Sequence, residues 1–244
     1  MVLAAAREDK PTVAVILMFL AVFLFTLIDS SAKWLILYGL PAVQVIFARY
    51  CGAFLVLMLL FIPRGGLNQF VSNNPKLQFT RAIALLGGTT FNFLALQFLP
   101  ITTTIAIFFA MPLVITVLGY FILGEKVGFR RFAAVFVGFL GVLIIIQPWG
   151  QDFHWAMILS VAALFCASSY FILTRLLAGQ DNNATSQLWS SGVATFAIAP
   201  FALQNWYWPQ TNMGFCVLVI IGVFGAFSHI LATRAHLLAN ASTL

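Results

Sequence analysis

The sequence is poor in charge. Of its 244 residues, 7% are Asp, Glu, Lys or Arg, whereas soluble domains carry about 25%. The hydrophobic fraction is 62%. A soluble core of this length could not hide so much apolar surface behind so little charge. This excludes an ordinary soluble protein and indicates that the chain uses the bilayer as its second solvent.

Motifs for catalysis and metal binding are also missing. The three cysteines, Cys51, Cys166 and Cys216, stand singly inside apolar runs, without metal or disulfide spacing. There is no phosphate-binding loop, no His-Glu-x-x-His and no credible set of Ser, His and Asp for a triad. Basic residues are not interleaved with aromatics, as a nucleic-acid binder would require. We therefore expect no enzyme, no catalytic residues, no metal, no cofactor and no nucleic-acid partner.

What the sequence does have is long apolar runs separated by short connections. These runs are continuous rather than alternating and are about twice the length of a barrel strand. They predict an all-α polytopic membrane protein with eight helices, at roughly 12–37, 42–62, 77–98, 101–123, 130–148, 154–177, 184–206 and 213–233. No short apolar region with a small-residue cleavage site follows Arg7 and Lys10, so the first run is interpreted as a retained span.

Basic residues gather on alternate connections. One side holds Arg7, Lys10, Arg64, Lys76, Lys126, Arg130, Arg131, Arg175 and Arg234, whereas the opposite side has only Lys33, near a helix end. The opposite loops carry Trp149, Trp155, Trp206, Tyr207 and Trp208, as in an aromatic belt. The positive-inside rule then predicts a cytoplasmic N-terminus.

A faint internal repeat has an offset of about 140 residues, or five spans. The segment from Leu86 to Thr90 aligns with Phe224 to Ser228, and Pro41 to Gln44 aligns with Ala184 to Gln187. An odd number of spans per copy inverts the second copy in the membrane. Inverted repeats are common in transporters and place the substrate site near the midplane.

An ordered set of motifs carries a family resemblance. Leu99-Pro100 precedes a Thr-rich helix start, Met111-Pro112-Leu113 lies midway along that helix, and Leu123-Gly124-Glu125-Lys126 follows it. The next helix is Gly-rich, from Gly138 to Ile144. This pattern resembles the EamA family of the drug/metabolite transporter superfamily. The resemblance implies a secondary transporter that moves a small organic metabolite by alternating access between two inverted five-helix repeats.

The resemblance also implies a domain division. Residues 1–148 would form a complete first repeat, and 149–244 an incomplete second repeat with three helices and the start of a fourth. Family members have ten helices, so we expect this sequence to be part of a longer carrier. Asp29, Lys33 and Arg49 look similar to the pattern in members for uptake of adenosylmethionine or flavin-like compounds, without choosing between them.

Three charges lie at membrane depth. Asp29 and Lys33 are one turn apart on the first predicted helix, and Arg49 on the second lies at the depth of Asp29, about 12 Å below the outer surface. Such charges cost about 2.5–3.5 kcal/mol on the insertion scale and are functional candidates. In one interpretation Asp29 pairs with Arg49 or Lys33 and fixes packing. In the other, the cluster contacts the substrate or a coupling proton.

Five further residues are candidate substrate contacts, each with a structural alternative. Asn92 and His229 occupy nearly equivalent repeat positions and could line the pathway or bridge helices. Ser168 could line it or serve small-residue packing. Trp189 could stack on a substrate ring or fill the bundle. Pro112 disturbs its helix and exposes carbonyls, which marks either a binding region or a tolerated kink.

The sequence thus predicts a permease of the bacterial inner membrane, with the bilayer and a small-molecule metabolite as partners and possible proton coupling. The alternative is a membrane-embedded scaffold or receptor without transport. The sequence patterns of importers and exporters are the same, so they do not give the direction of transport. They do not give the oligomeric state either. The loop from Glu125 to Arg131 is expected to orient helix ends, with a possible role as an inner gate.

Overall fold

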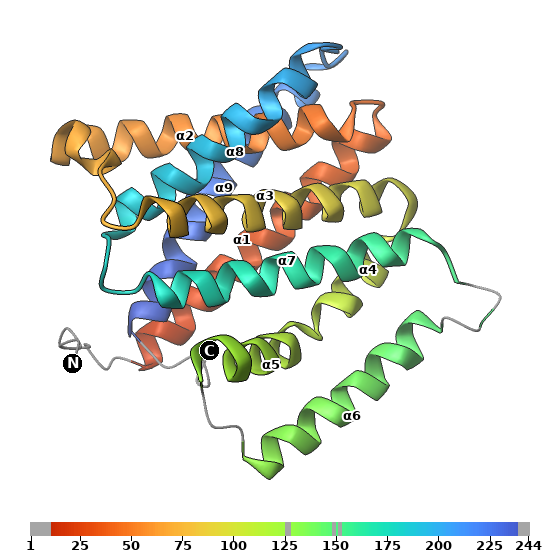
Figure 1. Ribbon diagram of the computed structural model, residues 1–244. Helices are drawn as coiled ribbons and strands as arrows, with labels where there is room; N and C mark the ends of the chain where they lie inside the picture. The colour runs from red at the N-terminus through yellow and green to blue at the C-terminus, as the bar shows by residue number, and fades with distance from the viewer. Residues whose placement is uncertain (1–10, 125–127, 148–149, 151–152, 239–244) are drawn as a thin grey trace. The chain divides into compact units, whose positions relative to one another are not determined.

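A computed structural model describes residues 11–124, 128–147, 150 and 153–238 (Figure 1). Its regular elements are α1 (Pro11–Leu37), α2 (Ala42–Gly65), a 3-10 turn η1 (Gly66–Phe70), α3 (Pro75–Phe98), α4 (Ile101–Phe108), α5 (Met111–Leu123), α6 (Phe129–Ile146), α7 (Ala156–Leu176), α8 (Asn183–Leu203) and α9 (Asn212–Leu238). Every element in these ranges is helical, which confirms the all-α prediction. Of the predicted loop from Glu125 to Arg131, residues 125–127 lie outside the described residues, and Arg130 and Arg131 lie in the first turn of α6.

Six helical stretches in the described residues are long and apolar enough to cross a bilayer. They are Thr12–Leu37, Ala42–Phe70, Pro75–Phe98, Ile101–Leu123, Ala156–Leu176 and Asn212–Ala235. Six of the eight predicted spans are therefore confirmed by length and composition. The other two correspond to α6 and α8, whose membrane crossing stays a prediction. In α8 the first half is rich in Ser, Thr and Gln, which lowers its hydropathy.

The fourth predicted helix, at 101–123, is interrupted. It ends as α4 at Phe108 and restarts as α5 at Met111. Pro112 lies in the first turn of α5, where its missing N–H needs no intrahelical acceptor. The break before Pro112 agrees with the disturbance of the helix that was expected from the proline ring. Within α5, Thr116 Oγ1 donates to the Pro112 carbonyl at 2.8 Å.

The chain divides into two compact units. The α1/α9 unit contains Met1–Ala82 and Leu177–Leu244, and the α5/α7 unit contains Ile83–Leu176. Helix α3 therefore contributes its first turns to one unit and the remainder to the other. Since each unit has its own internal packing, the two are described separately.

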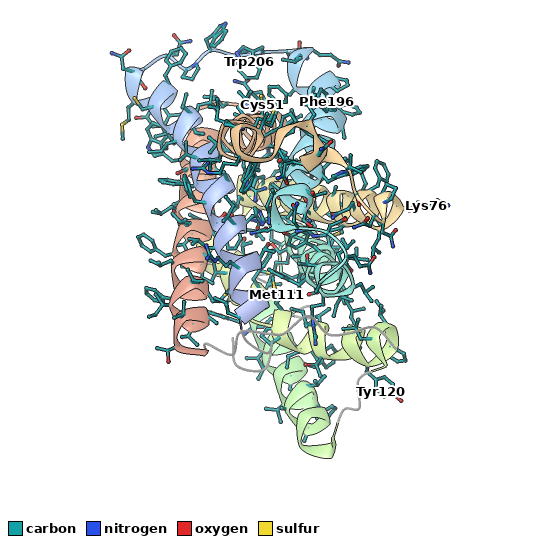
Figure 2. All side chains as sticks on the ribbon, turned by 90° about the vertical axis from the view of Figure 1, so that its left-hand side faces the viewer. Cys51, Lys76, Met111, Tyr120, Phe196 and Trp206 are labelled. Carbon is teal, nitrogen blue, oxygen red and sulfur yellow. The ribbon has the colours of Figure 1, made fainter. Side chains whose placement is uncertain are left out.

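In the α1/α9 unit, α1 packs along α9, and α2 packs against both α8 and α9 (Figures 1 and 2). The closest approach joins Gly52 and Gly222. A Cβ added at Gly222 would lie 2.6 Å from the Gly52 Cα, so only glycine fits this crossing. Small residues let transmembrane backbones approach in this way. Ala53, Leu57, Leu188 and Ala226 form the apolar core beside it.

In the α5/α7 unit, α7 packs against α4 and α5, and α6 packs against the same two helices. Gly138 of α6 faces Leu113, because an added Cβ would lie 2.2 Å from Leu113 Cδ1, whereas a Cβ at Gly141 meets no described atom within 4 Å. Of these two glycines, only Gly138 is therefore at a close helix approach. Gly87 and Gly88 of α3 lie against Cys166 and its neighbours on α7.

Candidate functional site

The centre of the α1/α9 unit holds a contact between two buried basic side chains. Arg49 Nη2 lies 3.1 Å from His229 Nε2, and the residues are only 5% and 8% exposed. A guanidinium can only donate, so His229 must accept through Nε2 and carry its proton on Nδ1. The imidazole in this arrangement is therefore neutral. Arg49 and His229 were predicted separately as candidates, and the structure brings them together.

Helix crossing geometry makes this contact possible. A Cβ at Gly225 would lie 3.5 Å from Arg49 Cγ, so the arginine stem runs over the small residue one turn before His229. Aromatic rings enclose the pair. The Phe25 ring meets His229 edge-on with centroids 5.0 Å apart, and the Arg49 Cζ lies 4.7 Å from the centroid of the Tyr50 ring. Such ring contacts favour a cation held away from water.

Asp29 and Lys33 lie on the same face of α1 as Phe25, because they follow it at four and eight residues. That face packs on α9, where Phe25 touches His229. Both side chains are half-buried. The structure therefore places the three predicted membrane-depth charges on neighbouring helices of one unit, with Asp29 one turn from Phe25, which contacts His229.

Arg81 is a charge at membrane depth that the sequence analysis overlooked. It is 0% exposed, and its Nη1 donates to the Ser186 carbonyl at 2.9 Å and to Ser190 Oγ at 2.8 Å. The sequence already indicated this buried charge, because Arg81 lies five residues after the basic Lys76 and inside the predicted span at 77–98.

Helix α8 buries its polar residues toward α3 and α9. Gln187 Nε2 donates to Thr233 Oγ1 at 2.7 Å and to the His229 carbonyl at 3.2 Å, which ties α8 to α9 at the level of the basic pair. Gln78 Nε2 donates to Ser186 Oγ at 2.9 Å. The polar half of α8 is thus the interior face of the unit.

Trp189 is anchored rather than isolated. Its indole Nε1 donates to the Phe70 carbonyl at 2.9 Å, at the end of η1. The side chain is half-buried, and its polar atom holds the α2–α3 connection against α8. This bond supports the bundle-filling interpretation of Trp189 over substrate stacking.

Asp181 joins two connections at one end of the unit, here called the Asp181 end. Its carboxylate accepts from Ser72 Oγ at 2.5 Å, from the Asn73 N–H at 2.8 Å and from Gln78 Nε2 at 2.8 Å. Partial burial alone would raise the pKa of Asp181, but these hydrogen bonds outweigh burial and hold the pKa below its usual value. The α2–α3 and α7–α8 connections therefore lie on the same side of the unit.

At the opposite end, Gln44 pairs with the backbone of Tyr207. Gln44 Nε2 donates to the Tyr207 carbonyl at 2.6 Å, and the Tyr207 N–H donates to Gln44 Oε1 at 3.0 Å. Tyr207 and Trp208 are exposed there, and Figure 2 shows Trp206 at the same end. The aromatic residues predicted for an interfacial belt in this unit thus share one end, across from Asp181.

Three predicted site residues belong to the α5/α7 unit. Asn92 on α3 is 7% exposed and Ser168 on α7 is 0% exposed, while Pro112 marks the start of α5. Ser168 Oγ is buried, and no hydrogen-bond partner for it is found among the described residues. A buried hydroxyl of this kind is uncommon and is noted as a candidate contact for a bound molecule.

Membrane-length helices around a buried polar centre define a multi-pass membrane protein of the transporter class. The model of the EamA-like transporter family matches residues 12–147, and the chain belongs to this family. The predicted resemblance is confirmed, and the chain is a membrane transporter of small metabolites.

Named relatives are transporters of two kinds. A riboflavin transporter of Vibrio cholerae serotype O1 is 29% identical over 96% of this chain and 80% of that protein. An S-adenosylmethionine uptake transporter of Rickettsia prowazekii is 26% identical over 90% of this chain and 76% of that protein. A crystal structure of a protein at 18% identity matches the fold with a TM-score of 0.66, over 92% of this chain and 78% of that one.

Proposed function

We propose that this transporter takes up a ring-bearing metabolite across the bacterial inner membrane by alternating access, with its N-terminus in the cytoplasm. The direction follows the uptake activity in the name of the Rickettsia relative. The orientation rests on the basic connections, two of which share the Asp181 end of the α1/α9 unit.

The substrate class is a nitrogen heteroaromatic ring joined to a polar chain. Riboflavin and S-adenosylmethionine, which the relatives' names give, both have that form. In this chain the buried polar centre is flanked by the rings of Phe25, Tyr50 and His229. Aromatic faces beside donors and charges are the features that such a molecule requires.

The Arg49–His229 contact is the observation that carries the proposed site. A buried guanidinium at membrane depth is costly and marks a functional position by default. Asp29 and Lys33 lie on the adjoining face of α1 and complete the group. Asn92, Pro112 and Ser168 stay separate candidate contacts within the α5/α7 unit.

The inverted-repeat architecture is part of the proposal. In two five-helix repeats, α7 corresponds to α1 as the first helix of its copy, and α9 corresponds to α3 as the third. Packing of α1 along α9 in one unit would then be mirrored in the other by α3 and α7, where Gly87 and Gly88 lie against Cys166. This pattern supports two inverted halves.

Uptake into sealed vesicles tests the proposal. Purified protein is reconstituted, and the accumulation of labelled riboflavin and labelled S-adenosylmethionine is measured with and without a pH gradient. Asp29→Asn should abolish uptake while leaving expression and folding intact. The control is Thr26→Ala on the same helix, because Thr26 is exposed and its hydroxyl bonds only the Val22 carbonyl one turn away.

Normal uptake by Asp29→Asn would remove Asp29 from the mechanism. Absence of uptake of both compounds by the unaltered protein would overturn the substrate class and favour a scaffold or receptor role. A gradient-dependent rate that Asp29→Asn loses would identify Asp29 as the proton-coupling group.

A further inference from the structure

Two buried serines of the α5/α7 unit differ from the other buried serines of the described helices. Ser160 and Ser168 on α7 are both 0% exposed, and their hydroxyls have no hydrogen-bond partner among the described residues. The other buried serines all take part in hydrogen bonds: Ser186 accepts from Gln78, and Ser190, Ser191 and Ser228 each donate to a backbone carbonyl of their own helix. Since most buried hydroxyls are paired, the two serines of α7 require an explanation.

The two hydroxyls lie on either side of the point where α7 meets the interruption between α4 and α5. Leu164, midway between them in the sequence, forms an apolar core with Ile107 and Ala110 beside that interruption. Ser160 and Ser168 therefore lie about one turn before and one turn after this contact. Both hydroxyls and the interrupted helix belong to the same compact unit.

The interruption also releases a backbone acceptor. In an unbroken α-helix the Phe108 carbonyl would accept from the N–H of residue 112, but Pro112 has no N–H. In transporters, broken helices of this kind place backbone carbonyls beside the bound molecule. One carbonyl and two hydroxyls suit a ligand with several hydroxyl groups, because each hydroxyl can both donate and accept.

The separation of the two serines sets the length of such a ligand. Eight residues of helix place Ser160 and Ser168 about 12 Å apart along the axis. A linear chain of five carbons spans about 5 Å, from bonds of about 1.5 Å, and a hydrogen bond of about 2.8 Å at each end brings the total to about 11 Å. A ribose ring is more compact and has its free hydroxyls on adjacent carbons, so it reaches one serine rather than both.

We infer that Ser160 and Ser168 hydrogen-bond a linear, hydroxyl-bearing chain of the transported molecule, with the Phe108 carbonyl as a further acceptor at the depth between them. This inference rests on the proposed function and narrows its polar chain to an open polyol. Of the compounds in the relatives' names, riboflavin has such a chain, whereas S-adenosylmethionine has a ribose ring. Both serines are enclosed in this structure, so the α4–α5 segment moves away from α7 on binding, with the interruption as its hinge.

Binding of two flavins to the purified full chain in lipid nanodiscs tests the inference. Riboflavin and lumiflavin have the same ring system, but lumiflavin carries a methyl group where riboflavin carries the polyol chain. The unaltered protein should bind riboflavin at least about tenfold more tightly, because lumiflavin leaves the serine hydroxyls unpaired. Ser160→Ala and Ser168→Ala should each weaken riboflavin binding by about 2- to 10-fold and change lumiflavin binding by less than about twofold.

Thermal unfolding of the same variants separates recognition from packing. Because neither hydroxyl has a described hydrogen bond to lose, both alanine variants should be at least as stable as the unaltered protein in the absence of ligand. A purely structural role predicts the opposite, which is lower stability at unchanged affinity. Ser169→Ala is the matched control, since Ser169 is the next residue on α7 and its hydroxyl donates to the Phe165 carbonyl at 2.8 Å. It should leave both flavin affinities unchanged.

Three outcomes overturn the inference: equal binding of riboflavin and lumiflavin, a loss of stability in the alanine variants at unchanged affinity, or binding of S-adenosylmethionine alone. In each case, uptake of either named compound into sealed vesicles would leave the proposed function standing. Conversely, serine-dependent riboflavin binding without movement of label across a sealed vesicle would support the polyol subsite and refute transport of that probe. Binding of none of the probes would refute the proposed substrate class and the inference together.

Discussion

The two units of this transporter stabilise their interiors differently. In the α1/α9 unit, side chains bond across helices: Arg49 to His229, Gln187 to α9 and Arg81 to α8. In the α5/α7 unit, Ile107, Ala110 and Leu164 form an apolar core, and Ser168 Oγ has no described partner. Polar groups at membrane depth therefore join helices of the α1/α9 unit, and an apolar cluster fills part of the α5/α7 unit.

The difference has a physical cause that can be read on single helices. Lipid cannot hydrogen-bond, so polar side chains of a span turn toward neighbouring helices. Helix α8 has a polar half and buries it, whereas α5 and α7 expose the large apolar residues Phe121 and Phe165. Tyr120 of α5 is exposed as well (Figure 2). Substitutions should then affect the two units through different interactions.

The largest expected difference concerns glycine crossings. Gly222→Ala places a Cβ 2.6 Å from the Gly52 backbone, which must move, whereas Gly87→Ala meets the Cys166 Sγ at 3.3 Å, a contact that a side chain relieves. Gly222→Ala should destabilise by about 1–3 kcal/mol or more, and Gly87→Ala by less. Thermal unfolding in detergent measures both, with Gly141→Ala as control, since its Cβ meets no described atom.

Equal stability of Gly222→Ala and Gly141→Ala would show that the α2–α9 crossing is looser than the structure indicates. Hydrogen exchange on the same samples locates the effect. Faster exchange in α2 and α9 with unchanged exchange in α5 and α7 is expected if the units unfold separately.

The next prediction compares polar groups. Gln187→Leu removes donors to Thr233 and to the His229 carbonyl and should cost about 0.6–2 kcal/mol. Ser168→Ala should be neutral or slightly stabilising, because the hydroxyl has no described hydrogen bond to lose. Chemical and thermal unfolding measure both. A Ser168→Ala variant as damaged as Gln187→Leu would mean that Ser168 has a partner, such as a bound molecule.

Much of this organisation was predictable from local signals. Continuous apolar runs gave the helices, and the Pro112 ring predicted the disturbance between α4 and α5. Counting residues from helix ends put Asp29 and Arg49 at similar depth on adjacent helices, and both belong to the α1/α9 unit. These features depend on composition and on spacing within one helix, which the chain displays directly.

Other features depend on distant partners. Arg49 and His229 are 180 residues apart, and their contact follows from a Gly52–Gly222 crossing that no spacing reveals. In the sequence, Gln187 stood out only because it aligns with Gln44 in the internal repeat. In the structure Gln187 bonds α9, whereas Gln44 bonds the Tyr207 backbone. Arg81 was missed for a different reason. Its position inside the predicted span at 77–98 already marked it as a charge at membrane depth.

A smaller effect is expected at Trp189. Trp189→Phe keeps an aromatic ring but removes the Nε1–H that bonds the Phe70 carbonyl, so stability should fall by about 0.5–1.5 kcal/mol. If Trp189 fills the bundle, as its bond indicates, the affinity for substrate should stay unchanged. Trp189→Leu separates the alternatives: a substrate-stacking role requires it to lose affinity that Trp189→Phe keeps.

The smallest effect is expected from Asp181, outside the membrane-spanning helices. Its pKa is held below the usual value by hydrogen bonds from Ser72, Gln78 and Asn73, which outweigh the raising effect of burial. The ionised carboxylate therefore stabilises the folded protein above the unfolded pKa of about 3.9, and this contribution is lost as the pH falls through the folded pKa. Asp181→Asn should be less stable at pH 7 by about 0.5–1 kcal/mol.

The pH dependence distinguishes this charge from simple packing. The difference in unfolding temperature between the unaltered protein and Asp181→Asn should stay constant from pH 7 to about 5 and shrink below about pH 4, since asparagine does not titrate. A difference that persists at pH 3 would mean that shape rather than charge joins the two connections. Exchange in α5 and α7 should be the same in both proteins at each pH, because the carboxylate's described partners, Ser72, Asn73 and Gln78, all lie in the α1/α9 unit.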